Sequence, residues 1–316
     1  MNNKLHPHQK EELADLAVAA MRERGLEPEF PKPAIEQLKT IDGPSAEDGA
    51  GIVDMTGLLW CSIDNDDSRD LDQLTASEVL PDGSVRILVA IADVDTLVEK
   101  ETPIDRHAQI NTTSVYTSAR IFPMLPEKLS TDFTSLNPHE ERVATVTEMV
   151  FAPDGEMLRS HITRARVHNK AKLAYDAVAA WIDGNGPLPE AADRVPGMDE
   201  QIRTQDSVAQ QLRARRREHG SLEFQTFQPR AEFQGDQVVA IKQQVQNRAR
   251  QLIEEFMVAT NGVTARFLAG KRRAAIRRVV RSPERWARIV ELAAEHGWPL
   301  PPEPDSSALE KFLQAE

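Results

Sequence analysis

The hydrophobic pattern at the start of the chain is helical. Apolar side chains in residues 9–24 recur every three or four positions, so they share one face of an amphipathic helix that stops at Gly25. A shorter helix is expected at residues 34–40, and residues 42–51, rich in Gly, Pro, Ser and acidic side chains, are expected to be a linker. We therefore expect a small helical domain, of helix-turn-helix type, over residues 1–50. A helical arm packed on the main domain fits the pattern equally well.

The pattern then becomes that of β-strands. Apolar and alternating runs predict strands at residues 73–80 and 85–93, and again at 143–151 and 157–167. A Pro-Asp-Gly turn separates the members of each pair, because proline fixes φ and glycine tolerates positive φ. Two hairpins are therefore expected. The irregular stretch between them, residues 111–138, is too apolar for disorder, and an irregular stretch of this length is typical of a functional segment.

Helices dominate the second half of the chain. Residues 305–316 begin a helical pattern and then end, so we expect the domain to continue in a longer protein. Together the patterns predict the α+β class, with a mixed β-sheet surrounded by helices over residues 51–316. Helices are expected at residues 170–182, 199–219, 246–268 and 282–296, and short strands at 222–227 and 238–245.

Composition narrows the class of protein. With 316 residues, 40% of them hydrophobic, the chain suits a soluble globular protein, and no apolar run is long enough for a membrane span or a signal core. The single cysteine, Cys61, excludes a disulfide framework and a cysteine-rich zinc site, so a cytoplasmic location is expected. A net charge of -12 argues weakly against a protein that binds nucleic acid over much of its surface. It does not exclude a local basic channel, because phosphate binding depends on nearby lysines and arginines.

Two basic clusters are candidates for such a channel. They lie at residues 213–217 and 271–281. The alternative for both is a solvated helix face. Glu254 and Glu255, on the helix predicted at residues 246–268, are likewise either ordinary helix charges or acidic contacts that face a site.

The chemistry of the chain is concentrated in one acidic stretch. Five aspartates fall within nine residues, directly after an apolar run at residues 58–60 that is expected to be a buried strand. Carboxylates this close repel one another unless a cation lies among them, and hard cations prefer oxygen ligands. We therefore expect Asp64, Asp70 and Asp72 to converge on one or two Mg²⁺ ions at the end of a strand.

Other interpretations of the acidic stretch are an ordinary solvated loop and a calcium loop. The calcium loop fails, because Arg69 occupies the sixth place counted from Asp64, where glycine is needed, and Thr75 occupies the twelfth, where glutamate is needed. Apolar runs on both sides and the counter-charge of Arg69 favour a site over a solvated loop.

A series of ordered motifs now resembles the RNB catalytic domain of the ribonuclease II family. The resemblance covers roughly residues 57–268 and is carried by residues 62–64, 69–72, 89–94, 113–116, 122–126, 129–130, 135–138, 217–224, 252–257 and 261. It implies a hydrolytic exoribonuclease that degrades single-stranded RNA from its 3' end to nucleoside 5'-monophosphates with Mg²⁺.

The resemblance also implies roles for single residues. Asp64, Asp70 and Asp72 match three of the four catalytic aspartates of the family. Tyr116 matches the aromatic side chain that stacks on the terminal base, and Phe224 lies where a second stacking ring occurs. Glu254 and Glu255 fall in a motif of the same domain and are assigned to the RNA-binding side.

The chain departs from the family at two places. Gln73 stands where the fourth aspartate is usual; its amide oxygen can still coordinate Mg²⁺ or hold a water, but it carries no charge. The Ser-Pro-hydrophobic-Arg motif is missing, since residues 282–285 read Ser-Pro-Glu-Arg and suit a helix start. An inactive RNA-binding or regulatory protein of the same fold is therefore the alternative function. A phosphodiesterase acting on DNA or small nucleotides is a third.

Overall fold

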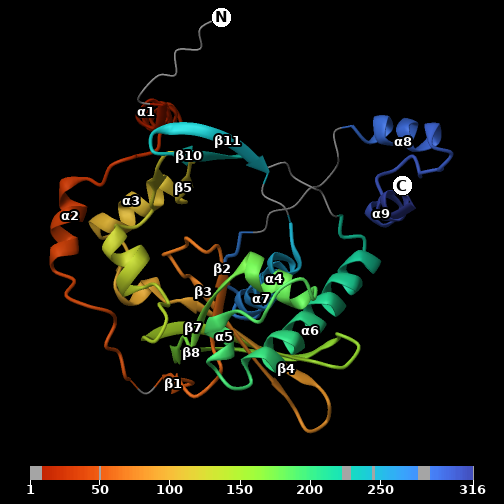
Figure 1. Ribbon diagram of the computed structural model, residues 1–316, viewed down its shortest axis with the longest axis horizontal. Coiled ribbons are helices and arrows are strands. Elements are labelled where there is room, and N and C mark those ends of the chain that lie inside the picture. Colours follow the sequence, from red (N-terminus) through yellow and green to blue (C-terminus); the bar gives the residue numbers. More distant parts are fainter. Residues whose placement is uncertain (1–8, 50, 223–228, 244–245, 277–284, 316) are drawn as a thin grey trace, which may run out of the picture.

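A computed structural model describes residues 9–49, 51–222, 229–243, 246–276 and 285–315, and its centre is a seven-stranded mixed sheet (Figure 1). The order is β1-β8-β7-β4-β3-β2-β9, antiparallel inside, with β1 parallel to β8 and β9 parallel to β2 at the edges. The strands are β1 (Ile52–Asp54), β2 (Cys61–Asp64), β3 (Gln73–Val79), β4 (Val85–Ala92), β7 (Glu141–Phe151), β8 (Met157–His168) and β9 (Ala171–Ala174).

The two predicted hairpins are confirmed. β3 pairs with β4, and β7 pairs with β8 through eleven register positions. Gly83 and Gly155 close the two turns with φ of 81° and 82°, values that a side chain with a Cβ rarely adopts. The α+β prediction holds because this sheet is mixed and flanked by helices.

Helices α4, α6 and α7 pack on one face of the sheet (Figure 1). Their apolar side chains meet those of β2, β4 and β7 in one cluster that includes Ile63, Phe151 and Phe256. The other face carries a second cluster around the fully buried Trp60 and Leu74. The helical elements are α1 (Gln9–Glu23), α2 (Lys32–Lys39), η1 (Val94–Thr96), α3 (Pro103–Asn111), η2 (Leu129–Phe133), α4 (Tyr175–Ile182), α5 (Glu190–Asp193), α6 (Met198–Glu218), α7 (Arg248–Gly270), α8 (Trp286–Glu295) and α9 (Ser306–Ala315).

Two local predictions were wrong. The strand expected at residues 58–60 is β2, which starts three residues later at Cys61, and Trp60 before it is buried in the second apolar cluster instead of pairing in the sheet. The helix expected from residue 170 begins only at Tyr175. Residues 171–174 form β9 instead, since Ala171 and Leu173 are buried while Lys172 between them is not, the alternation of a strand.

The N-terminal helices contact different parts of the molecule. α2 packs with α3 and η2 in a third apolar cluster, and the side chain of Asn111 exchanges two hydrogen bonds of 2.8 Å with the backbone of Glu27. α1 lies beside the separate hairpin of β10 (Pro229–Gln234) and β11 (Gln237–Gln243). The division of the chain at residue 50 stays a prediction.

The stretch at residues 111–138 is ordered, as expected. It contains η2 and the short pair β5 (Val115–Tyr116) and β6 (Ile121–Phe122). α8 and α9 form a fourth apolar cluster, whereas most of the strand expected at residues 222–227 and the helix start expected at Ser282 lie outside the described residues. Across the described ranges, every helix is too short or too polar to cross a membrane.

Candidate active site

The aspartates lie where two adjacent strands end. β2 and β3 are antiparallel, with Cys61 opposite Thr75, and continuing this register toward their connection sets Asp64 opposite Asp72. The connecting loop, residues 65–72, has no regular secondary structure and carries Asp70. The sheet therefore fixes the two ends of the acidic stretch, while the loop between them depends on other contacts.

The three carboxylates act on one another electrostatically. Loss of hydration inside the fold, followed by the charge of Asp70, raises the pKa of Asp64, although the backbone N–H of Asn65 partly offsets the rise. Asp72 is open to solvent on one side, yet the protein around it removes part of its hydration, and this together with the charge of Asp64 raises its pKa. The carboxylates of Asp64 and Asp72 are therefore harder to ionise than solvated ones.

The described residues contain no group of three His, Cys, Asp or Glu side chains arranged to hold a metal ion as they stand. A separate feature of the site points to a missing partner. Gln73 is buried, and its Nε2 donates to the backbone oxygen of Ile63, 3.1 Å away. Its Oε1 accepts no hydrogen bond from the described part of the chain. A buried oxygen without a donor is costly, so this atom keeps an acceptor that a cation can use.

Tyr116 reaches the acidic loop from β5. Its hydroxyl donates a hydrogen bond to the Oδ2 atom of Asp70. Partial loss of hydration and this carboxylate raise the pKa of Tyr116 to about 12. The side chain is 62% exposed, so its ring is open to a ligand while its hydroxyl contacts the acidic loop.

Sequence reasoning missed an arginine and a second tyrosine beside Asp64. Arg250, on α7, donates to the Oδ1 atom of Asn65 over 2.8 Å and lies 4.4 Å from the ring centre of Tyr175. Its positive charge acts against the rise in the pKa of Asp64. Burial and the charge of Asp64 raise the pKa of Tyr175 to about 12. The available indication was spacing, since Arg250 precedes Glu254 by one helical turn.

The remaining predicted site residues divide in three ways. Glu254 accepts a hydrogen bond of 3.0 Å from Gln246. Glu255 is buried against α6, where Arg216 donates to it over 2.7 Å, and burial raises its pKa. Phe224 lies outside the described residues.

The two basic clusters are only partly described. Arg216 belongs to the cluster expected at residues 213–217 and is engaged with Glu255, while Arg213 in the same cluster donates to Gln251 over 2.6 Å. These bonds join α6 to α7. Of the cluster at residues 271–281, only residues 271–276 are described.

The chain resembles known ribonucleases over most of its length. The RNB domain matches residues 52–315. Ribonuclease R of Escherichia coli (strain K12) is 33% identical over 262 residues, which cover 81% of this chain and 32% of that protein. The chain thus spans about a third of the length of the curated relatives that it matches.

Solved structures share the fold. The chain superposes on Mycoplasma genitalium RNase R in complex with ribose-methylated single-stranded RNA with a TM-score of 0.85 and 24% identity, covering 96% of this chain and 48% of that one. Yeast Ssd1, a pseudonuclease, gives a TM-score of 0.65 and 12% identity over 84% of this chain and 32% of its own. Since the domain match covers most of its residues, the chain belongs to the RNB-domain family.

Proposed function

We propose that the chain carries the hydrolytic site of a Mg²⁺-dependent 3'-to-5' exoribonuclease, which degrades single-stranded RNA to nucleoside 5'-monophosphates in the cytoplasm. The observation that supports this most directly is the set of electrostatically coupled carboxylates of Asp64, Asp70 and Asp72 where β2 and β3 end. Membership of the RNB-domain family supports the same conclusion.

The donor atoms at this site suit a hard divalent cation. All three side chains offer carboxylate oxygens, and the Oε1 atom of Gln73 is a neutral oxygen without a described donor. Mg²⁺ prefers such oxygen ligands. Loss of hydration and, after it, repulsion between the aspartates raise the pKa of Asp64 and Asp72, and a cation among the carboxylates offsets the repulsion. When bound, Mg²⁺ supplies positive charge that polarises the scissile phosphodiester and acidifies the attacking water.

The side chains around the carboxylates bind and orient the RNA in this proposal. Tyr116 presents an exposed ring on which the terminal base stacks, and stacking contributes about 1–3 kcal/mol per base without regard to sequence. Phe224 and Glu254 are assigned to the same RNA path. Glu255 belongs to it through Arg216, which it holds by an ion pair. Arg250 steadies the loop through Asn65 and brings positive charge toward the anionic substrate.

One observation favours the alternative, an RNA-binding protein without catalysis. Gln73 replaces a charged ligand with an amide, and the chain superposes on a pseudonuclease, yeast Ssd1. The two functions differ in whether bound RNA is hydrolysed.

A substrate panel separates these functions. Single-stranded RNA and single-stranded DNA of one sequence are incubated with the chain and with Asp72→Asn, each with Mg²⁺ or EDTA, and the products are identified. The proposal expects nucleoside 5'-monophosphates from RNA only, with Mg²⁺ only, and none from the variant, which still binds RNA. Binding without products from either protein would support the alternative, and hydrolysis by Asp72→Asn at the wild-type rate would refute the assignment of the site.

A further inference from the structure

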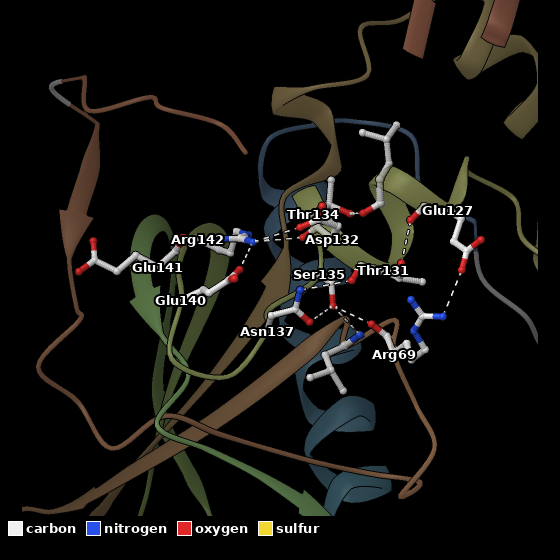
Figure 2. Close-up of polar contacts among 12 residues, drawn as sticks. Arg69, Glu127, Thr131, Asp132, Thr134, Ser135, Asn137, Glu140, Glu141 and Arg142 are labelled. Carbon is white, nitrogen blue, oxygen red and sulfur yellow. Dashed lines mark hydrogen bonds and ion pairs between the residues drawn. The ribbon is translucent and has the colours of Figure 1, made fainter. Parts of the chain in front are cut away.

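Asp70 is the proposed ligand that lies farthest from both strands, because Asp64 ends β2 and Asp72 directly precedes β3 and accepts a backbone hydrogen bond from Ala92. Residues 65–71 lie in no strand, so contacts from outside this stretch must set the direction of the Asp70 side chain, and the hydroxyl of Tyr116 supplies one of them. On the η2 side of the loop, these contacts come from the segment at residues 129–142, shown in Figure 2.

The hydroxyl of Ser135 contacts the peptide groups on both sides of Asp70. Its oxygen accepts the backbone N–H of Leu71 over 3.0 Å, and its single proton is shared between the backbone oxygen of Arg69, 3.1 Å away, and the Oδ1 atom of Asn137, 3.0 Å away. The first group belongs to the peptide that follows the Cα of Asp70, and the second belongs to the peptide that precedes it. One buried hydroxyl therefore restrains both φ and ψ of Asp70, and with them the direction of its Cβ.

Neighbouring contacts hold Ser135 in place. The backbone N–H of Leu136 donates to the oxygen of Leu71 over 2.8 Å, which makes the contact between the two segments continuous. Asn137 lies 3.0 Å from the Ser135 hydroxyl through Oδ1 and donates to the oxygen of Thr131 through Nδ2, as Figure 2 shows. The hydroxyl is thus attached to η2 on one side and to the acidic loop on the other.

We infer that Ser135 is a positioning residue that holds the Asp70 carboxylate toward the cation site. This inference rests on the proposed function. The restraint is needed because the carboxylates of Asp64 and Asp72 repel that of Asp70. The residues around Asp70 are in no strand, so the sheet does not hold them in place. Residues that orient the ligands of a metal typically change its affinity about 10–100-fold when they are removed.

The test compares Ser135→Ala with Thr134→Val. Thr134 is the adjacent buried residue, and its hydroxyl donates to the oxygen of Leu129 within its own segment, so its loss weakens η2 without touching Asp70. Four quantities are measured: the amide hydrogen exchange rate at Leu71 without metal, the dissociation constant of Mn²⁺ as a probe for Mg²⁺, and kcat and KM for single-stranded RNA. Ser135→Cys, which keeps a weak donor of similar shape, is measured in the same way if the alanine variant does not fold.

Ser135→Ala is expected to speed exchange at Leu71, weaken Mn²⁺ binding about 10-fold or more, and lower kcat with KM unchanged. Thr134→Val is expected to leave all four quantities near the wild-type values. Mn²⁺ binding by Ser135→Ala equal to wild type, or equal losses in both variants, would overturn the inference while leaving the proposed function intact. Failure of the wild-type protein to bind Mn²⁺ or hydrolyse RNA would overturn both.

Discussion

Replacing Gln73 by glutamate tests how the charge of the acidic site affects protein stability and Mg²⁺ binding. Glutamate keeps the length of the side chain but exchanges the Nε2 donor for a second carboxylate oxygen, which then faces the backbone oxygen of Ile63 across 3.1 Å. The side chain is only 6% exposed, so water cannot replace the lost bond. Gln73→Glu is therefore expected to destabilise the protein without metal and to bind Mg²⁺ more tightly.

The expected size follows from the contacts. Leaving a buried hydrogen-bonding group unpaired costs about 1–3 kcal/mol, and repulsion from the three aspartates adds to this. For a domain of this size each kcal/mol lowers Tm by about 2–4 °C. Saturating Mg²⁺ stabilises both proteins, so it narrows the gap only as far as the variant binds more tightly, by about 1.4 kcal/mol for a tenfold lower dissociation constant. In EDTA the variant should therefore unfold at least about 2 °C below wild type, and saturating Mg²⁺ should close part of the gap.

Thermal unfolding over a Mg²⁺ series measures both effects. The matched control is Gln205→Glu, because Gln205 is also buried but lies on α6, where its Oε1 already accepts a hydrogen bond from Thr75. The control should lose stability that Mg²⁺ does not restore. Equal Tm values for Gln73→Glu and wild type in EDTA would refute the expected destabilisation without metal. Equal shifts of Tm with Mg²⁺ in the two variants would refute the role of residue 73 at the cation site.

Two further predictions concern single side chains. The pKa of Asp72 is raised in the folded protein, so without metal the wild-type protein loses stability as pH rises from about 4 through the folded pKa and this carboxyl ionises. Asparagine cannot ionise. Asp72→Asn should therefore unfold at a higher temperature than wild type in EDTA, by a difference in Tm that grows with pH. A margin independent of pH would contradict this. Tyr116→Ala should change the length of the terminal RNA products, whereas Tyr116→Phe, which keeps the ring, should not. Products of unchanged length from the alanine variant would argue against stacking.

Much of the fold could be predicted because most of its strands and long helices show their periodicity in the local sequence. The strands of both hairpins and the helices α6 and α7 carry their periodicities in sequence, and the turns carry glycine where φ is positive. The strand β9 was missed because it is four residues long and runs directly into α4, so the helical periodicity dominates the window. Its pairing with β2 is a long-range contact that local patterns do not encode.

The acidic candidates could be chosen from the sequence, and the residues that contact their loop could not. Asp64, Asp70 and Asp72 lie close together in sequence, so their density alone indicated a cation site. Arg250 and Ser135 reach the same loop from positions 185 and 66 residues away, measured from Asn65 and Arg69. Contacts at such separations depend on how α7 and η2 pack on the sheet. The partner of Glu255 was hidden for the same reason, because Arg216 lies on a different helix.

The most direct test of the central claim is a time course with single-stranded RNA labelled at its 5' end, with Mg²⁺ or EDTA, using the 316-residue chain and its Asp72→Asn variant. The account predicts a ladder that shortens from the 3' end to short labelled products, with Mg²⁺ and the wild-type chain only. Release of a labelled mononucleotide at the earliest times, or shortening that continues in EDTA or in the variant, would contradict it.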